Sequence, residues 1–263
     1  MKLSTLRSKL KLFSVGTNAK TLKSDKTFQN TLTAILYLAP STMAGNNYNV
    51  CRHASQGCKD LCLGKVAGRS VFSNVQAARI RKTKLFFEDN KTFKEQLFSD
   101  LSMFYKYCIE NEIQPYVRFN GTSDIDIQKI KYKQKDNKTV FDLFPDIKFY
   151  DYTKDPKRTS KYSNYRLTYS YSENVTEKQV VDKIKKGINV AVVFEELPST
   201  WLGVKVINAD TTDLRFEDEV GVICGLSPKG NKLKKAIKNN TDNGFVVRKN
   251  NIKTMNKINV VNL

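Results

Sequence analysis

The chain has 263 residues, 40% of them hydrophobic, so it can bury a core as one large domain or two small ones. Lys and Arg outnumber Asp and Glu by 45 to 26, a formal net charge of +19, which favours a polyanionic partner such as nucleic acid. No run approaches the roughly 18 apolar residues of a membrane span, so we expect no membrane-spanning segment. The charge has two other interpretations, a membrane surface as partner or a lysine-rich sequence encoded by an AT-rich genome.

Residues 1–30 are basic and polar, with no strong hydrophobic period. They hold seven Lys or Arg residues and one acid, Asp25. A secretory signal would need an apolar segment after this charge, and none follows, so we expect a cytoplasmic protein. We interpret residues 1–30 as an arm or cap before the main fold.

A short apolar run at residues 31–38, followed by Pro40, predicts a buried strand. A cysteine-rich loop comes directly after it. Residues 71–89 and about 93–112 then predict two helices from their apolar spacing. Cys108 falls on the apolar face of the second helix, so we expect it to be a core thiol and not a ligand.

Beyond residue 112 the pattern changes to short apolar strands, each followed by polar residues. A helix opened by the capping box at Thr176 and Gln179, and closed by Gly187, interrupts them. The further predicted strands are 115–119, 147–153, 165–171, 189–194, 204–208, 220–224 and 244–247.

With the first strand this makes eight, and buried parallel strands in that number predict an α/β fold with a (β/α)8-like, TIM-type barrel. The connection from Glu195 to Val204 is too short for a helical crossover, so we expect an irregular or incomplete barrel. No linker or repeat divides the chain, which predicts one barrel domain at residues 31–247 and a tail at 248–263.

The cysteine loop is the strongest chemical signal. Cys51, Cys58 and Cys62 lie within twelve residues, together with His53, the single histidine of the chain. Clustered thiolates suit an iron–sulfur cluster or zinc, and we expect all four residues to be metal ligands. We prefer a 4Fe-4S cluster, because the loop comes directly after the first strand of the expected barrel. The alternative is a structural Cys3His zinc site. A disulfide between two of these three cysteines is less favoured, because it would leave the third as a free thiol.

Polar residues follow most of the predicted strands. In a barrel the carboxyl ends of all strands meet at one mouth, so these residues should gather beside the cysteine loop. We predict catalytic roles for Asp124, Lys154, Glu173 and Asp210. Asn120 and Lys229 would share the same mouth.

The helix at 71–89 carries a dense group of basic residues. We predict that Arg79, Arg81 and Lys82 bind nucleic-acid phosphates and that Tyr152 stacks on an unpaired base. Tyrosines in strands more often serve packing.

Nine short motifs along the chain form a common pattern. They are Pro40, Cys51-x6-Cys58-x3-Cys62-Leu63, Ala67-Gly68-Arg69, Ala78-Arg79-x2-Lys82-Thr83, Arg118-x-Asn120-Gly121-Thr122-Ser123-Asp124, Phe149-Tyr150-Asp151-Tyr152-Thr153-Lys154, Asn164-Tyr165-x-Leu167-Thr168, Asp213-x-Arg215-Phe216 and Gly225-Leu226-x2-Lys229-Gly230. These motifs resemble a family of phage proteins, similar to the phage gene-product-eighty-eight family and often labelled a rolling-circle replication initiator. The resemblance covers roughly residues 32–247 and implies a phage protein of the infected bacterial host's cytoplasm, with DNA replication as its process.

The chain is also distantly similar to radical SAM enzymes, which carry three cysteines in the loop after the first barrel strand. Their usual spacing is Cys-x3-Cys-x2-Cys, whereas this chain has Cys-x6-Cys-x3-Cys. The likeness implies S-adenosylmethionine as a cofactor. Asn120, Gly121 and Ser123 would contact it, because they follow the second strand, where those enzymes place a cofactor-binding turn.

Three functions stay open. The first is a cluster-containing barrel enzyme of the radical SAM type that acts on nucleic acid or a nucleotide. The second is a phage replication nuclease that nicks DNA with a tyrosine or a metal-bound water. The third is a basic nucleic-acid-binding protein with a structural zinc site.

Overall fold

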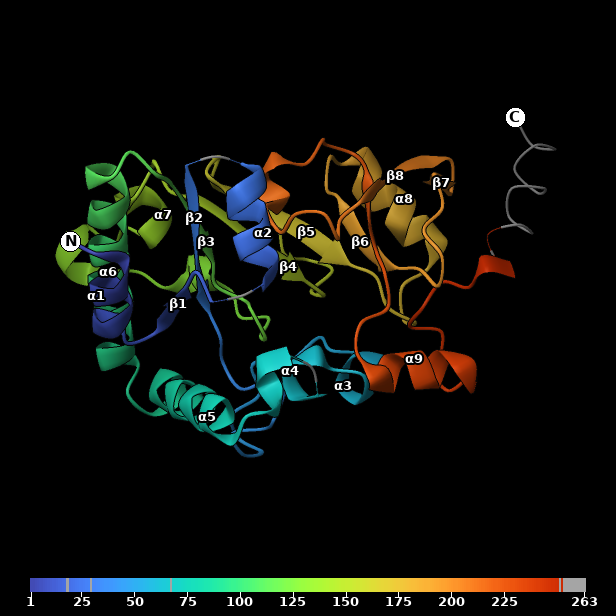
Figure 1. The fold of residues 1–263 in the computed structure, drawn as a ribbon, viewed down its shortest axis with the longest axis horizontal. Helices are drawn as coiled ribbons and strands as arrows, with labels where there is room; N and C mark the ends of the chain where they lie inside the picture. Colours follow the sequence, from blue (N-terminus) through green and yellow to red (C-terminus); the bar gives the residue numbers. More distant parts are fainter. Residues whose placement is uncertain (18, 29, 67, 251, 253–263) are drawn as a thin grey trace.

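A nine-stranded sheet forms the centre of the fold, and helices cover both of its faces (Figure 1). The structure is a computed structural model that describes residues 1–17, 19–28, 30–66, 68–250 and residue 252. The strands are β1 (Phe13–Val15), β2 (Thr31–Leu36), β3 (Gln114–Arg118), β4 (Lys148–Thr153), β5 (Tyr165–Ser170), β6 (Val190–Val193), β7 (Thr200–Trp201), β8 (Val204–Asn208) and β9 (Ile223–Leu226).

The strands lie in the order β1-β2-β3-β4-β5-β6-β9-β8-β7. All neighbours from β2 to β8 pair in parallel, while β1 and β7 are antiparallel to their partners at the two edges. Because the parallel strands share one direction, their carboxyl ends meet along one edge of the sheet. That edge faces α3 and α4 (Figure 1).

The helices differ widely in length, from single turns to the 21 residues of α6. They are α1 (Leu3–Lys9), α2 (Ala19–Thr27), α3 (Gln56–Asp60), α4 (Leu63–Val66), α5 (Ser73–Glu88), α6 (Asn90–Glu110), α7 (Val140–Leu143), α8 (Glu177–Lys185) and α9 (Asn231–Lys238), with the 3-10 turns η1 (Gly68–Val71), η2 (Ile127–Lys129), η3 (Lys133–Lys135) and η4 (Arg215–Glu217).

The main hydrophobic core lies between α6 and the convex face of β2 to β4. Phe93, Leu97, Leu101 and Phe104 form one apolar stripe of α6 and are fully buried. They belong to the same cluster as alternate residues of β2 and β3, such as Ala34. Burying each large side chain contributes roughly 1.5–3 kcal/mol, which anchors the first strands and the loop that follows β2.

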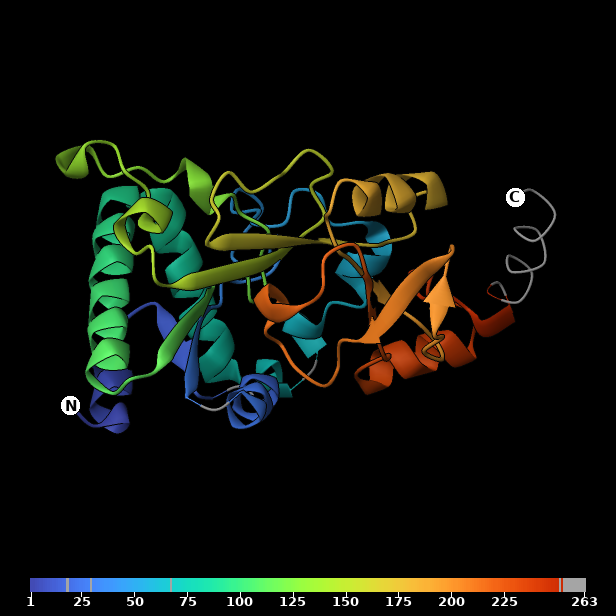
Figure 2. The same cartoon turned by 90° about the horizontal axis from the view of Figure 1, so that it is seen from above.

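The concave face of the sheet is covered by α2 and η4, as the view from above shows (Figure 2). This side is polar. Arg118 of β3 makes an ion pair with Asp213 (3.2 Å), which also accepts a hydrogen bond from the Tyr150 hydroxyl (3.1 Å). The backbone N–H of Asp213 donates to Ser24 of α2 (2.7 Å). These bonds hold η4 and α2 against the interior of the curved sheet.

The mixed α/β class is confirmed, but the sheet is open, so the chain does not form the (β/α)8-like barrel, irregular or incomplete, that the strand count predicted. Residues 204–208 return as a hairpin from β7 and join the sheet beyond β9, which removes the crossover that closure needs. The predicted strand at 244–247 forms an isolated bridge between Val247 and Phe194. The predicted strand at 220–224 begins later, at Ile223.

The described part of residues 1–30, which we interpreted as an arm or cap, packs against the sheet. β1 pairs with β2, and Leu6, Leu12 and Phe13 are buried in the main core. The predicted tail at 248–263 lies mostly outside the described residues. None of the helices in the described part of the chain combines the length and apolar character needed to cross a membrane.

Candidate functional site at the cysteine loop

The loop after β2 carries the three clustered cysteines on short, well-capped turns. The backbone N–H of Ser41 approaches the Cys51 sulfur at 3.3 Å. Ser55 is the N-cap of α3, and its hydroxyl accepts a hydrogen bond from the backbone N–H of Cys58 (3.2 Å). Cys62 precedes α4 directly. Capping at Ser55 therefore sets the position of the second cysteine.

The three thiols are half-buried, free of disulfides and close enough to affect one another. The pKa of Cys51 is raised to about 12, mainly by burial and to a smaller extent by the charges of Cys62 and Cys58. Burial also raises the pKa of Cys58, an effect that the neighbouring Lys154 opposes. A charged partner or a metal would be needed to hold these sulfurs as thiolates near neutral pH.

As they stand, no three His, Cys, Asp or Glu side chains of the described residues are arranged to hold one metal ion. His53 lies with its Nε2 3.6 Å from the Asp155 carboxylate, and its side chain is 45% exposed. The loop thus supplies three neighbouring sulfurs, the donor set that iron–sulfur clusters take. The three cysteines therefore fit an iron–sulfur cluster by the chemistry of their donor atoms.

The turn after β3 packs directly on the cysteine loop. The backbone N–H of Asp124 donates to the Val50 carbonyl (2.8 Å), and the Cys51 thiol lies 3.8 Å from the Thr122 carbonyl. A Cβ on Gly64 would meet the Thr122 methyl at 2.8 Å, so only glycine fits there without a shift. The turn and the loop form one unit.

Asp124 and Lys154, from the ends of β3 and β4, meet beside the thiols. The Asp124 carboxylate accepts a hydrogen bond from the Lys154 backbone N–H (2.8 Å) and pairs with Arg158 (2.9 Å). The Lys154 ammonium donates to the Tyr171 carbonyl (2.9 Å). Burial lowers the pKa of Lys154, while the negative charges of Cys58, Asp124 and Glu173 oppose this.

Glu173, which follows β5, holds the cysteine loop by its carboxylate. It accepts hydrogen bonds from the Gly57 backbone N–H (2.7 Å) and the Ser55 hydroxyl (2.8 Å). Three of the four predicted catalytic residues therefore gather at the loop. The fourth, Asp210, pairs with Lys229 (2.6 Å) at the ends of β8 and β9, and the structure records no contact between this pair and the thiols among the described residues.

The residues predicted to bind a cofactor form the turn itself. Asn120 is buried and bonds through its amide to Asp151 (3.1 Å) and the Ile125 carbonyl (3.0 Å). Ser123 donates to the Asn120 side-chain oxygen (2.9 Å). A Cβ on Gly121 would meet the Tyr37 ring at 2.6 Å, so the backbone approaches the ring closely. A cofactor contact at these residues stays a prediction.

The comparisons with known proteins gave one match. The family model described as Gene product 88 matches residues 9–249, which is nearly the whole chain. The chain belongs to the Gene product 88 family. It is a phage protein family, as the motifs indicated. Neither the curated proteins nor the solved structures gave a match.

In this Gene product 88 chain the predicted nucleic-acid residues divide into two groups. Arg79 is buried and donates to the Gly64 carbonyl (2.9 Å) and the Ser70 hydroxyl (2.8 Å), so it holds the cysteine loop. Tyr152 lies under the Arg118 guanidinium, 4.7 Å from carbon to ring centre. Arg81 is exposed, and Lys82 is half-buried against residue 12.

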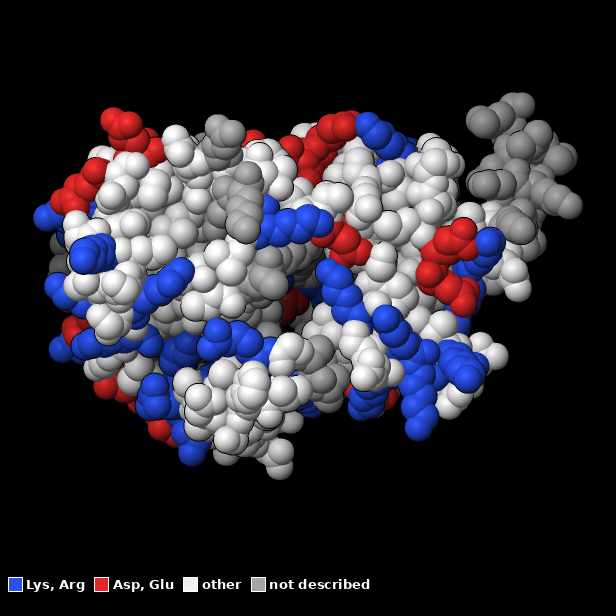
Figure 3. Space-filling view, viewed as in Figure 1, with Lys and Arg blue, Asp and Glu red and all other residues white. Residues whose placement is uncertain are grey.

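Arg118 is a site residue that the sequence analysis missed. It is the one charged residue in the apolar strand 115–119, and that isolated charge was the available signal. Its guanidinium lies on the concave face, among the rings of Tyr152 and Tyr150. The face is hollowed between α2 and the α3–α4 region, with Lys and Arg at the rim (Figure 3).

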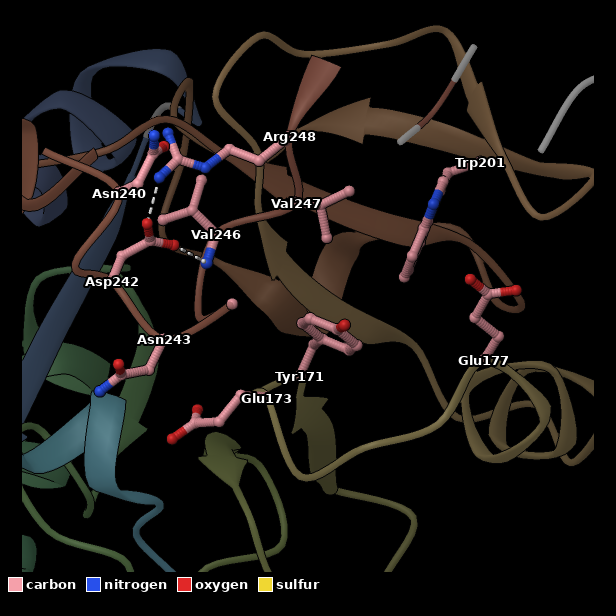
Figure 4. Close-up of a pocket in the computed structure, with 11 residues that line it drawn as sticks. Tyr171, Glu173, Glu177, Trp201, Asn240, Asp242, Asn243, Val246, Val247 and Arg248 are labelled. Atoms are coloured by element: carbon pink, nitrogen blue, oxygen red, sulfur yellow. Dashed lines mark hydrogen bonds and ion pairs between the residues drawn. The ribbon is translucent and has the colours of Figure 1, made fainter. Parts of the chain in front are cut away.

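A cavity of about 400 Å³ adjoins the site on the side of β7 and α8 (Figure 4). Tyr171 and Trp201 line it, with their rings edge to face at 5.5 Å. Asp242 and Arg248 form an ion pair on its wall. Glu173 lines the same cavity, so one carboxylate lies between this space and the cysteine loop.

Proposed function

We propose that this protein is an iron–sulfur enzyme of the radical SAM type that acts on nucleic acid or a nucleotide. One observation carries the proposal. Three free thiols lie at the carboxyl edge of a parallel sheet, in the loop after its first parallel strand, beside polar residues from the ends of β3, β4 and β5. Functional groups of parallel α/β folds gather at that edge.

Cys51, Cys58 and Cys62 would hold the 4Fe-4S cluster. Three protein sulfurs leave one iron of such a cluster open to a second ligand, for which S-adenosylmethionine is the proposed cofactor. When bound, the cluster would supply the electron that breaks a carbon–sulfur bond of that cofactor. A closed zinc site of the Cys3His type has less support, because His53 faces Asp155.

The surrounding residues would bind and orient the ligands. The ammonium of Lys154 has three N–H donors, one of which donates to Tyr171, so the others can serve a carboxylate or phosphate. Asp124 keeps that backbone in place through its bond to the Lys154 N–H. Glu173 fixes α3 and with it the position of Cys58.

A nucleic-acid or nucleotide substrate is supported by charge. The net charge of +19 is unevenly displayed, and a band of Lys and Arg crosses one face between the α1–β1 segment and α5 toward the central hollow (Figure 3). Phosphates bind such bands mainly through charge, which gives an affinity that falls steeply with salt.

A nicking nuclease is less well supported. Rolling-circle nickases use two metal-binding histidines, and this chain has one histidine. The candidate acids bind separate partners: Asp124 pairs with Arg158, Asp213 with Arg118 and Asp210 with Lys229. Burial also raises the pKa of Tyr150 and Tyr152, which disfavours the tyrosinate that would attack DNA.

The test is reductive cleavage of S-adenosylmethionine by anaerobically reconstituted protein. We expect dithionite-reduced wild-type protein to release 5′-deoxyadenosine and the Cys62→Ala variant to release none. The Cys224→Ala variant, altered at a buried thiol away from the loop, should keep the activity. Equal release by Cys62→Ala and wild type, or no release by a protein that has bound iron and sulfide, would contradict the proposal.

A further inference from the structure

A second cavity, of about 440 Å³, lies between residues 10–12, α5 and α6. Its polar lining consists of Lys11, Arg81, Lys82 and Gln96, and its apolar lining of leucines. Three cations and no acid therefore surround one hollow. This cavity is separate from the cysteine loop and from the cavity at Tyr171.

The cations of this cavity are only partly balanced by the protein. Among the described residues, none of Lys11, Arg81 and Lys82 forms an ion pair, although the charge of Asp100 acts on Lys82 and Lys11. Asp100 is buried and accepts the backbone N–H groups of residues 11 to 13 at 2.7–3.2 Å. Its carboxylate is thus occupied in holding the segment that forms one wall.

Lys82 is the most confined of the three. Its ammonium donates to the Leu12 carbonyl (2.9 Å), which leaves two N–H donors. The pKa of Lys82 is lowered to about 8, mainly by burial and to a smaller extent by the positive charges of Arg79 and Arg81. A bound anion would oppose both effects, because its negative charge would pair with the ammonium and offset the arginines.

We infer that this cavity binds a phosphate group of a single-stranded nucleic acid. The lining has the charge for a phosphate dianion or diester, Gln96 adds an amide donor, and the leucine walls reduce competition from water. The choice of nucleic acid rests on the proposed function.

The cavity is well placed to hold a substrate strand. The helix α5 carries Arg81 and Lys82 at the cavity and Arg79 at the cysteine loop. Arg79 and Lys82 are three residues apart, which corresponds to about 4.5 Å along the helix axis. The band of Lys and Arg in Figure 3 runs over this region toward the central hollow. A strand held here by one phosphate lies beside the path to the thiols.

The experiment measures binding of a short labelled single-stranded DNA by the full chain over a range of salt concentrations. Arg81→Gln removes an exposed cation that makes no recorded hydrogen bond, so its effect is not structural. We expect about tenfold weaker binding and a salt slope smaller by roughly one ion. Lys84→Gln removes the same charge from an exposed position of α5 outside the cavity and should change affinity by less than about twofold.

Two further measurements test whether the group bound in the cavity is a phosphate. Inorganic phosphate should compete with DNA more strongly than chloride at equal ionic strength, and Lys82→Arg should retain binding that Lys82→Gln loses. Equal losses in Arg81→Gln and Lys84→Gln, or an unchanged affinity in Arg81→Gln, would overturn the inference. Iron content is measured on the same samples: wild type without iron but with these binding differences would refute the proposed function and leave the phosphate site supported.

Discussion

The carboxylate of Glu173, which follows β5, accepts a hydrogen bond from the backbone N–H of Gly57 in the cysteine loop at 2.7 Å. These residues are 116 positions apart in the chain. The bond joins a strand end to the first turn of α3. The contact is close, since a Cβ on Gly57 would lie 3.1 Å from both carboxylate oxygens and would require them to shift. The loop is therefore held from the sheet, and its cysteines are positioned by residues far away in sequence.

Replacing Glu173 with alanine should loosen the loop. The substitution leaves the Gly57 N–H and the Ser55 hydroxyl without their acceptor, which costs roughly 1–3 kcal/mol locally. We expect the loop thiols of metal-free protein to react about tenfold faster with a thiol reagent, because local opening becomes easier. Glu177→Ala is the control, because Glu177 is exposed and lines the cavity at Tyr171 that Glu173 also lines. Its loop thiols should react at the wild-type rate. Identical rates in both variants would show that Glu173 does not hold the loop.

The contact between Gly64 and Thr122 can be tested by a double-mutant cycle. Gly64→Ala would place a methyl 2.8 Å from the Thr122 methyl, and such overpacking should lower the free energy of unfolding by about 1–3 kcal/mol. Thr122→Ser removes that methyl and keeps the hydroxyl that donates to Leu38. The double variant should recover part of the loss in chemical denaturation, whereas strictly additive effects would refute the contact.

Asp151 predicts a pH dependence of stability. Burial raises the pKa of this carboxyl to about 7 from its usual 3.8, although the bonds from Asn120 and Tyr165 oppose the rise. Between about pH 4 and pH 7 the folded protein holds a proton that the unfolded chain has released, so the free energy of unfolding falls as the pH rises.

The measurement compares wild type with Asp151→Asn by denaturation across that range. The difference between them should change by on the order of a few kcal/mol, since each pKa unit corresponds to about 1.4 kcal/mol. The wild type should lose stability relative to the variant as the pH rises. A difference that is constant from about pH 4 to pH 8 would mean that Asp151 titrates normally.

The sequence predicted the elements whose patterns are local. The apolar stripe of α6 and the capping box at Thr176 were sufficient, because both are determined by neighbours three or four residues apart. Seven of the predicted strands correspond to strands of the sheet. The short edge strands β1 and β7 were missed, as three and two residues carry too little pattern to be recognised.

Closure of the sheet and the composition of the site depend on long-range contacts. The strand count favoured a barrel, but the hairpin of β7 and β8 places the last strands at an open edge. The gathering of Asp124, Lys154 and Glu173 beside the cysteines follows from parallel strand ends, which the sequence could predict. The pairing of Asp210 with Lys229 and the pairing of Arg118 with Asp213 could not be predicted from spacing.

Iron and acid-labile sulfide in anaerobically purified and reconstituted protein show whether the cysteine loop holds a 4Fe-4S cluster. Cys58→Ala removes one loop sulfur, and Cys108→Ala removes a buried sulfur in α6 as the matched control. We expect about four iron atoms per chain, with matching sulfide, in wild type and Cys108→Ala, and a large loss of both in Cys58→Ala. Zinc in place of iron, no metal in wild type, or the same iron content in Cys58→Ala would contradict it.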